Sequence, residues 1–129
     1  MHLHEKPRIL AQFFVGQPPN CRRRVKRARQ FYEGTLGLIP ARSFGDETTG
    51  WIEYDIGPAT LSIGNVAPQW KPSHGGGCAG LEVDDFPSAI ERLTAAGCPL
   101  YGPMESHVCH MAIVSDPDGN SLAIHKRKA

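Results

Sequence analysis

Residues 115–128 have the sequence SDPDGNSLAIHKRK, a turn followed by the last strand of the chain. The five residues DPDGN at 116–120 all favour turns. In the following SLAIH, small or polar residues alternate with Leu122 and Ile124, which is the period of a strand with one buried face. Ser121, Ala123 and His125 therefore lie on the opposite face, and the middle position of that face is an alanine.

The residues before this strand indicate that one structural unit occurs twice. In the first half, ILAQFFV at 9–15 predicts a buried strand, and apolar residues at helical spacing predict a helix near 22–34. Strands are expected at 40–46, 51–56 and 57–65, with Gly57 and Pro58 at the bend of the last hairpin.

The second half repeats this order. CAGLEVDD at 78–85 predicts a strand whose acidic end can cap a helix, and FPSAIERLTAAG predicts that helix near 86–96. Both helices end at a glycine and are followed by a proline-containing turn and further strands. We therefore predict an α+β fold of two βαβββ modules, about 8–65 and 77–126, with a linker at about 66–76 in one domain spanning 1–129.

Length and composition limit the class of protein. A chain of 129 residues with 40% hydrophobic content is large enough for one core and too short for two. We find no apolar run long enough for a membrane span or a signal peptide, which predicts a cytoplasmic protein without a membrane partner. The four cysteines show no CxxC pairing, so we expect free thiols.

Basic residues are concentrated in two places, although the net charge is only +1. Six lie within residues 22–29 and three within 126–128. Such a patch can attract nucleic acid, but this one lacks the interleaved aromatic residues that stack on bases. We expect a solvated helix face and no nucleic-acid partner, and keep an interaction module that uses the basic helix as an alternative function.

The motifs resemble those of a known family. FYEGTLGL closes the first helix, LEVDDFPSAIERLTAAGCPL lies in the second module, and SDPDGNSLAIH ends the chain. Together they resemble the vicinal oxygen chelate superfamily in its glyoxalase and bleomycin-resistance-like branch, over residues 8–126. The resemblance implies a curved mixed sheet around a cleft, with the helices outside, and a homodimer.

The resemblance also places the family's metal ligands, which come from the first and last strands of each module. The corresponding positions here are Gln12, Ser62, Cys78 and Ala123. Ala123 thus stands where the family's last metal carboxylate would be. An amide, a hydroxyl and one thiol are a poor ligand set for a divalent cation, so we expect no metal and no other cofactor.

A different metal site in the same cleft is an alternative. Glu82, His110 and His125 could gather if the strands that carry them all turn these residues inward. Each also has an ordinary structural explanation, because a single strand histidine is commonly just hydrogen-bonded. Cys78 has no base at a fixed spacing that would make it a nucleophile, and the sequence leaves catalysis open.

Aromatic residues favour a site for a small organic molecule. Phe14 and Trp51 are expected on the inward face of the first module, and Trp70 lies in the linker. The predicted ligand-binding cleft consists of Gln12, Phe14, Trp51, Ser62, Cys78, His110, Ala123 and His125. The first functional hypothesis is a metal-free protein that binds an organic ligand in a dimer cleft, and the main alternative is a metal-dependent lyase, isomerase or dioxygenase.

Overall fold

A computed structural model describes residues 9–16, 24–66, 71–73, 75 and 77–129, with only the backbone described for residues 9 and 10. Trp70 and the N-terminal end of the basic run lie outside the described residues. Within the described part of the chain, no helix is long and apolar enough to cross a membrane.

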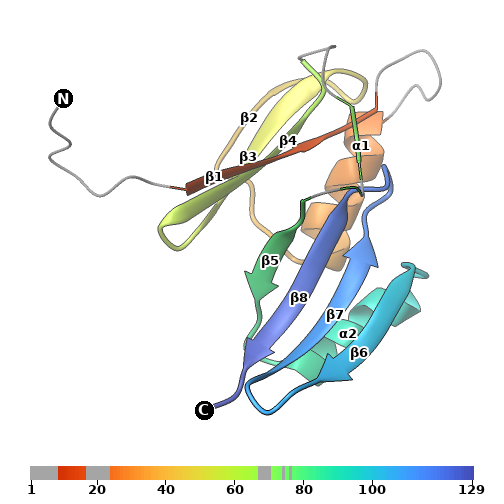
Figure 1. The fold of residues 1–129 in the computed structure, drawn as a ribbon. Coiled ribbons are helices and arrows are strands. Elements are labelled where there is room, and N and C mark those ends of the chain that lie inside the picture. The colour runs from red at the N-terminus through yellow and green to blue at the C-terminus, as the bar shows by residue number, and fades with distance from the viewer. Residues whose placement is uncertain (1–8, 17–23, 67–70, 74, 76) are drawn as a thin grey trace, which may run out of the picture.

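The first module has one helical segment and four strands (Figure 1). Its elements are β1 (Ile9–Phe14), α1 (Arg24–Arg29), the π-helix η1 (Gln30–Thr35), β2 (Arg42–Gly45), β3 (Gly50–Ile56) and β4 (Ala59–Gly64). The strand order in the sheet is β1-β4-β3-β2, with β1 parallel to β4 and the other pairs antiparallel. The predicted first helix thus continues as a π-helix after Arg29.

The second module repeats this plan. Its elements are β5 (Ala79–Glu82), α2 (Phe86–Ala95), β6 (Leu100–Glu105), β7 (Cys109–Ser115) and β8 (Ser121–Arg127), in the sheet order β5-β8-β7-β6. Asp85 caps α2 by accepting a hydrogen bond from the Ser88 amide at 3.0 Å, as the acidic end of the predicted strand led us to expect. The predicted α+β fold of two βαβββ modules is confirmed.

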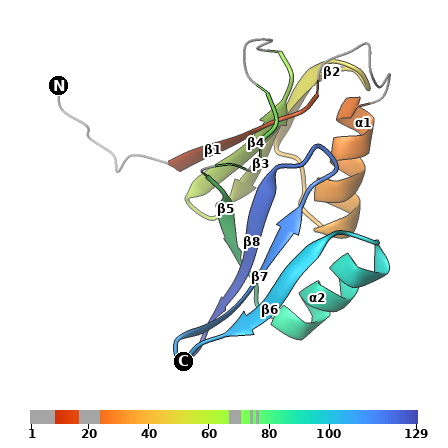
Figure 2. The same cartoon turned by 45° about the vertical axis from the view of Figure 1, so that its right-hand side comes forward.

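The helices lie on one side of the two sheets (Figure 2). The sheet faces that meet them supply Ile52, Tyr54, Leu61 and Ile63 from the first module and Ala112, Val114, Leu122 and Ile124 from the second. These residues form one hydrophobic cluster with residues of α1, η1 and α2, so the two modules share a core. Within the residues that the structure describes, the other face of each sheet carries no helix, and it holds most of the residues predicted for the site.

Candidate functional site

The helix-free face of the first sheet, called the first open face below, is built around Gln12 and Ser62. These residues are paired across β1 and β4, and Glu53 of β3 is paired with Ser62, so all three side chains lie on the same face. The Ser62 hydroxyl donates a hydrogen bond to Oε1 of Gln12, and Ser62 is fully buried. The two residues of the first module that occupy inferred metal-ligand positions are therefore hydrogen-bonded to each other.

Aromatic side chains occupy one end of the first open face. Phe14 of β1 and Trp51 of β3 are both paired with Gly64 of β4, and Phe44 of β2 is paired with Trp51. The Phe44 side chain is 62% exposed, which is unusual for a large apolar residue. Sequence reasoning missed Phe44, because only the β2–β3 register shows that it adjoins Trp51.

Charged side chains border the same face. Arg42 donates to Glu53 at 2.5 Å and to Asp55 at 2.5 Å, and the Trp51 indole N–H donates to Glu53 at 2.9 Å. The hydrogen bonds from Arg42 and then Trp51 lower the pKa of Glu53. The sequence did not single out Arg42 or Glu53, although they hold Trp51 in place.

The corresponding face of the second sheet, called the second open face below, is largely apolar. Ala123 is paired with Gly80 of β5 and Ile113 of β7, and Met111 is paired with His125. Tyr101 and Met104 of β6 are paired with Ile113 and Met111, which brings them onto this face as well.

Glu82 and His125 form the polar end of the second open face. They are paired across β5 and β8, and Nδ1 of His125 is hydrogen-bonded to Oε1 of Glu82. The backbone N–H of Arg127 donates to Oε2 of Glu82 at 2.7 Å. The Arg127 amide, followed by His125, lowers the pKa of Glu82, so the carboxylate is held in its charged form.

The expectation that His110 shares this face is wrong. His110 of β7 is paired with Lys126 of β8, which is the neighbour of His125. Successive residues of a strand point to opposite sides of the sheet, so His110 and His125 lie on opposite faces. Its ring lies 5.6 Å from that of Phe86 on α2, and its Nδ1 is 3.4 Å from Glu105. The predicted group of Glu82, His110 and His125 therefore does not form in this chain.

Cys78 precedes β5 and is exposed. It lines a hollow of about 290 Å³ together with Gln12, Phe13 and Lys71. Ser62 and Ala123 are not among the residues that line this hollow. Of the four positions inferred for a metal, the chain thus brings Gln12 close to both Ser62 and Cys78, while Ala123 lies against Gly80.

The donor chemistry of these positions does not fit the family's metal ion. The Gln12 carbonyl oxygen already accepts a hydrogen bond from the Ser62 hydroxyl, and the Ala123 side chain has no atom that can ligate a metal. No carboxylate or imidazole is present at the four positions to offset the dehydration of a divalent cation. Among the residues that the structure describes, no group of three His, Cys, Asp or Glu side chains is arranged to hold a metal.

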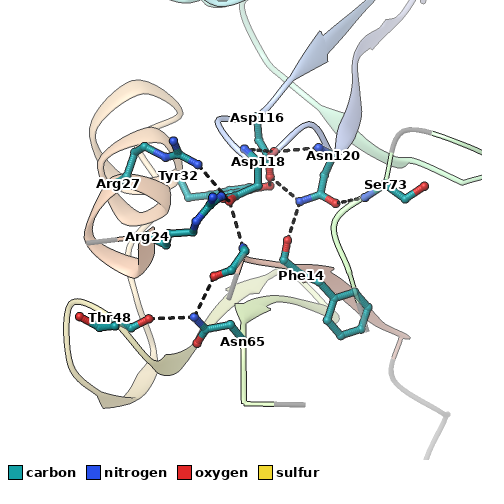
Figure 3. Close-up of polar contacts among 11 residues, drawn as sticks. Phe14, Arg24, Arg27, Tyr32, Thr48, Asn65, Ser73, Asp116, Asp118 and Asn120 are labelled. Carbon is teal, nitrogen blue, oxygen red and sulfur yellow. Dashed lines mark hydrogen bonds and ion pairs between the residues drawn. The ribbon is translucent and has the colours of Figure 1, made fainter. Parts of the chain in front are cut away.

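The DPDGN loop between β7 and β8 makes contacts that the sequence did not predict (Figure 3). The fully buried side chain of Asp118 accepts hydrogen bonds through Oδ1 from the Gly16 amide at 3.0 Å, from Arg24 at 3.2 Å and from Arg27 at 3.1 Å. These three residues all belong to the first module. The expectation that the basic helix merely presents a solvated face is therefore wrong for Arg24 and Arg27.

Asp116 and Asn120 extend this set of contacts. The Asp116 carboxylate accepts a hydrogen bond from the Tyr32 hydroxyl at 2.7 Å. Burial raises the pKa values of both groups. The Asn120 amide donates to the Phe14 carbonyl at 3.0 Å and accepts from the Ser73 amide at 3.0 Å. We call these contacts of Asp116, Asp118 and Asn120 the junction network, because they join the loop before β8 to β1, to the first-module helices and to the linker.

The glyoxalase/bleomycin resistance protein/dioxygenase superfamily model matches residues 21–124, most of the chain. The chain belongs to this superfamily. In this glyoxalase-superfamily protein the match begins after β1 and ends within β8, and it includes Asp116, Asp118 and Asn120 of the junction network. No curated protein matches the chain significantly.

Several solved structures have the same fold. TnmS3, an antibiotic binding protein from Streptomyces sp. CB03234, is 22% identical with a TM-score of 0.73, and the match covers 98% of this chain and 100% of TnmS3. A putative glyoxalase family protein from Bacillus anthracis is 20% identical with a TM-score of 0.73, covering 99% and 100% of the two chains. Glyoxalase I from Leishmania major is 19% identical with a TM-score of 0.67, covering 95% and 87%.

Proposed function

We propose that this superfamily member binds a small organic molecule without the family's metal ion, in a cleft where the first open face of one copy meets the second open face of another. Membership in a superfamily that includes bleomycin resistance proteins, and a fold like that of an antibiotic binding protein, support small-molecule binding.

The hydrogen bond between Ser62 and Gln12 is the observation that carries the proposal. A metal ligand must offer a lone pair to the ion, and the hydrogen bond from Ser62 occupies one of the two lone pairs of the Gln12 oxygen, while both side chains are uncharged. The position that would supply the last carboxylate is Ala123, which has only a methyl group. The four inferred ligand positions thus offer hydrogen-bonding groups and apolar surface but no carboxylate.

Exposed apolar side chains on both open faces support a dimer. Phe44 on the first face is 62% exposed and Tyr101 on the second is 71% exposed, although aromatic rings of this size are usually covered. A two-fold dimer that places unlike faces together would cover both sets at two equivalent sites. The ligand would then lie between Trp51 and Phe14 of one copy and Met111 and Ile113 of the other.

The other functions have weaker support. A metal-dependent lyase, isomerase or dioxygenase needs donors that the inferred positions do not supply. An interaction module based on the basic helix needs free cationic groups, but Arg24 and Arg27 are paired with the buried Asp118.

A thermal-shift screen of chelator-treated protein with a panel of aromatic antibiotics tests the proposal. We expect at least one compound to raise the melting temperature of the metal-free dimer, and addition of Zn²⁺, Ni²⁺, Fe²⁺ or Mn²⁺ to leave its affinity unchanged. Trp51→Ala should weaken binding by about tenfold or more, since a buried aromatic contact commonly contributes over 1 kcal/mol. Glu91→Ala, on the exposed side of α2, is the matched control. About one equivalent of tightly bound metal in the purified protein, or ligand binding only with metal, would overturn the proposal.

Restoring the family's ligands provides a second test. The triple variant Ser62→Glu, Cys78→His and Ala123→Glu should bind a divalent metal that the natural protein does not bind, because charge and ligand number determine affinity. Ser62→Gln, Cys78→His and Ala123→Gln is a control of similar size without the carboxylates. Equal metal binding by both variants would show that these positions do not form one site.

A further inference from the structure

The proposal of a metal-free cleft assigns no role to the hydrogen-bonded pair of Glu82 and His125. Both residues lie on the second open face, and His125 is two positions beyond Ala123 on the same side of β8. Residues so spaced along a strand are about 7 Å apart, which a ligand with a fused ring system can span. A ligand beside Ala123 would therefore reach His125.

The carboxylate determines which nitrogen of His125 is available. Oε2 of Glu82 is held by the Arg127 amide, and Oε1 is bonded to Nδ1 of the ring. A carboxylate favours a proton on the nitrogen that it faces, so Nδ1 is the protonated atom in the neutral ring. The remaining atom, Nε2, then has a free lone pair and can accept a proton from a ligand.

The surroundings of His125 favour a developing negative charge on a ligand. A hollow of about 450 Å³ at this end of the sheet is lined by His125, His107, Cys109, Arg127 and Lys128. Besides Glu82, the charged groups near the ring are thus mainly cationic, although Lys128 also lies 3.2 Å from Glu105. Lys126, on the other face of β8, acts on Glu82 as a further positive charge.

Apolar side chains lie next to this polar end. Met111 is directly opposite His125, and Ala123 and Ile113 follow along the same face. A ligand here would rest its apolar body on these side chains and direct a single polar group to Nε2.

We propose that His125, positioned by Glu82, is the proton-accepting group of the binding site, and that the ligand carries a weakly acidic hydroxyl, a phenol or an enol, on an apolar body. On binding, the ligand O–H bond breaks, the proton forms a bond to Nε2, and the electron pair stays on oxygen as a phenolate or enolate. The resulting imidazolium lies between Glu82 and the anionic ligand. This inference rests on the proposed function, because it describes the ligand of the same cleft.

The probe is 4-nitrophenol, whose phenolate absorbs at a longer wavelength than the neutral phenol, with 4-nitroanisole as the analogue that lacks the proton. At a pH below the pKa of free 4-nitrophenol, we expect the natural protein to bind the phenol and to show phenolate absorbance. 4-Nitroanisole should bind about tenfold more weakly, which is about 1.4 kcal/mol, because it cannot make the charge-assisted hydrogen bond to Nε2.

Variants identify the group responsible. His125→Gln should lose the phenolate signal and about tenfold in affinity for 4-nitrophenol, with no change for 4-nitroanisole. Glu82→Gln should keep binding but show less phenolate, since the imidazolium loses its partner. His110→Gln removes a histidine from the opposite face of the same sheet and should change neither result. Thermal unfolding of each variant checks that it is folded.

The outcomes separate this inference from the proposed function. Equal binding of both probes, or unchanged phenolate in His125→Gln, would overturn the role of His125 while small-molecule binding stands. If neither probe binds, nitrogen NMR of the His125 ring decides the question. A neutral ring with its proton on Nδ1 in the natural protein, and with the proton shifted toward Nε2 in Glu82→Gln, supports a base positioned by Glu82. A proton on Nε2 in the natural protein overturns the inference.

Discussion

The two modules have equivalent hairpins before their last strands, but the turns of these hairpins differ. Between β3 and β4 the turn is Gly57 and Pro58, both exposed at the surface. Between β7 and β8 the turn has five residues, and its Asp116 and Asn120 are only 5% and 3% exposed. Asp116 and Asn120 of the second turn are buried because this turn contacts the first module through the junction network.

This difference shows that two turns at equivalent positions of a repeated unit can have different structural roles. Both turns reverse the chain, but only the DPDGN loop also fixes where its strand begins relative to the other module. Asn120 is bonded to the Phe14 carbonyl at the end of β1 and directly precedes β8, which carries Ala123 and His125. Breaking the junction network should therefore affect stability far more than equivalent changes elsewhere.

The largest effect is expected from Arg24→Gln combined with Arg27→Gln. The buried Asp118 carboxylate would keep only the Gly16 amide as a described donor, and an uncompensated buried charge costs on the order of 3–5 kcal/mol. Urea unfolding measures the loss. Lys26→Gln on the same helix, whose ion pair with Glu47 is exposed, should cost less than about 1 kcal/mol. Equal effects of the two changes would contradict the assigned role of Asp118.

Asp118→Ala should be the next most damaging, by about 3 kcal/mol, because it removes three hydrogen bonds between the modules. The arginines that lose their partner are partly exposed and can be hydrated, which moderates the cost. Asp84→Ala, at an exposed aspartate of the second module, should stay within about 0.5 kcal/mol in the same urea experiment. If Asp118→Ala lowers the free energy of unfolding by less than about 1 kcal/mol, the junction network does not contribute strongly to stability.

Asn120→Ala should cost about 2 kcal/mol, since the Phe14 carbonyl, the Ser73 amide and the buried Asp116 carboxylate each lose a hydrogen bond to the Asn120 side chain. Hydrogen exchange should also show faster exchange of β8 amides near Ser121, while the β3–β4 hairpin keeps its protection. If protection falls equally in both hairpins, Asn120 supports the whole fold and does not act locally on β8.

The smallest effects are expected from Gly57→Ala and Gly119→Ala, which compare the turns directly. Both glycines have positive φ, +56° and +90°, and neither would place a new methyl group within 4 Å of another atom. Each change should therefore cost about 1 kcal/mol from backbone strain alone. Thermal unfolding of the two variants compares the costs. A much larger loss at Gly119 would show that its backbone strain is transmitted to the junction network.

The order of elements could be predicted from the sequence because it depends on local patterns. Alternation in SLAIH correctly places Leu122 and Ile124 in the core, and DD before the second helix correctly predicts its cap. Asp118 looked like an ordinary turn residue, since nothing local indicates that Arg24, 94 positions away, would reach it. His110 was placed on the wrong face because the register between β7 and β8 depends on the length of their turn.

The side chains of the open faces could be predicted only in part. The family motif points to Gln12 and Ser62, and the pairing of their parallel strands brings these two residues into contact. Phe44, Arg42 and Glu53 were missed, because they reach the first open face through pairings with no sequence signature. Glu82 and His125 were noticed as possible metal ligands, but their direct hydrogen bond to each other required the structure.

The junction network also makes this chain attractive as a starting point for engineered binders. Its contacts come from the DPDGN loop, the first helix, the linker and the backbone of β1, whereas the side chains of the open faces contribute nothing to it. A combinatorial library could therefore randomise Phe44, Trp51, Met104, Met111 and Ile113 without disturbing what aligns the two modules. Selection against new drugs or dyes would then act on recognition surfaces whose relative placement is already set.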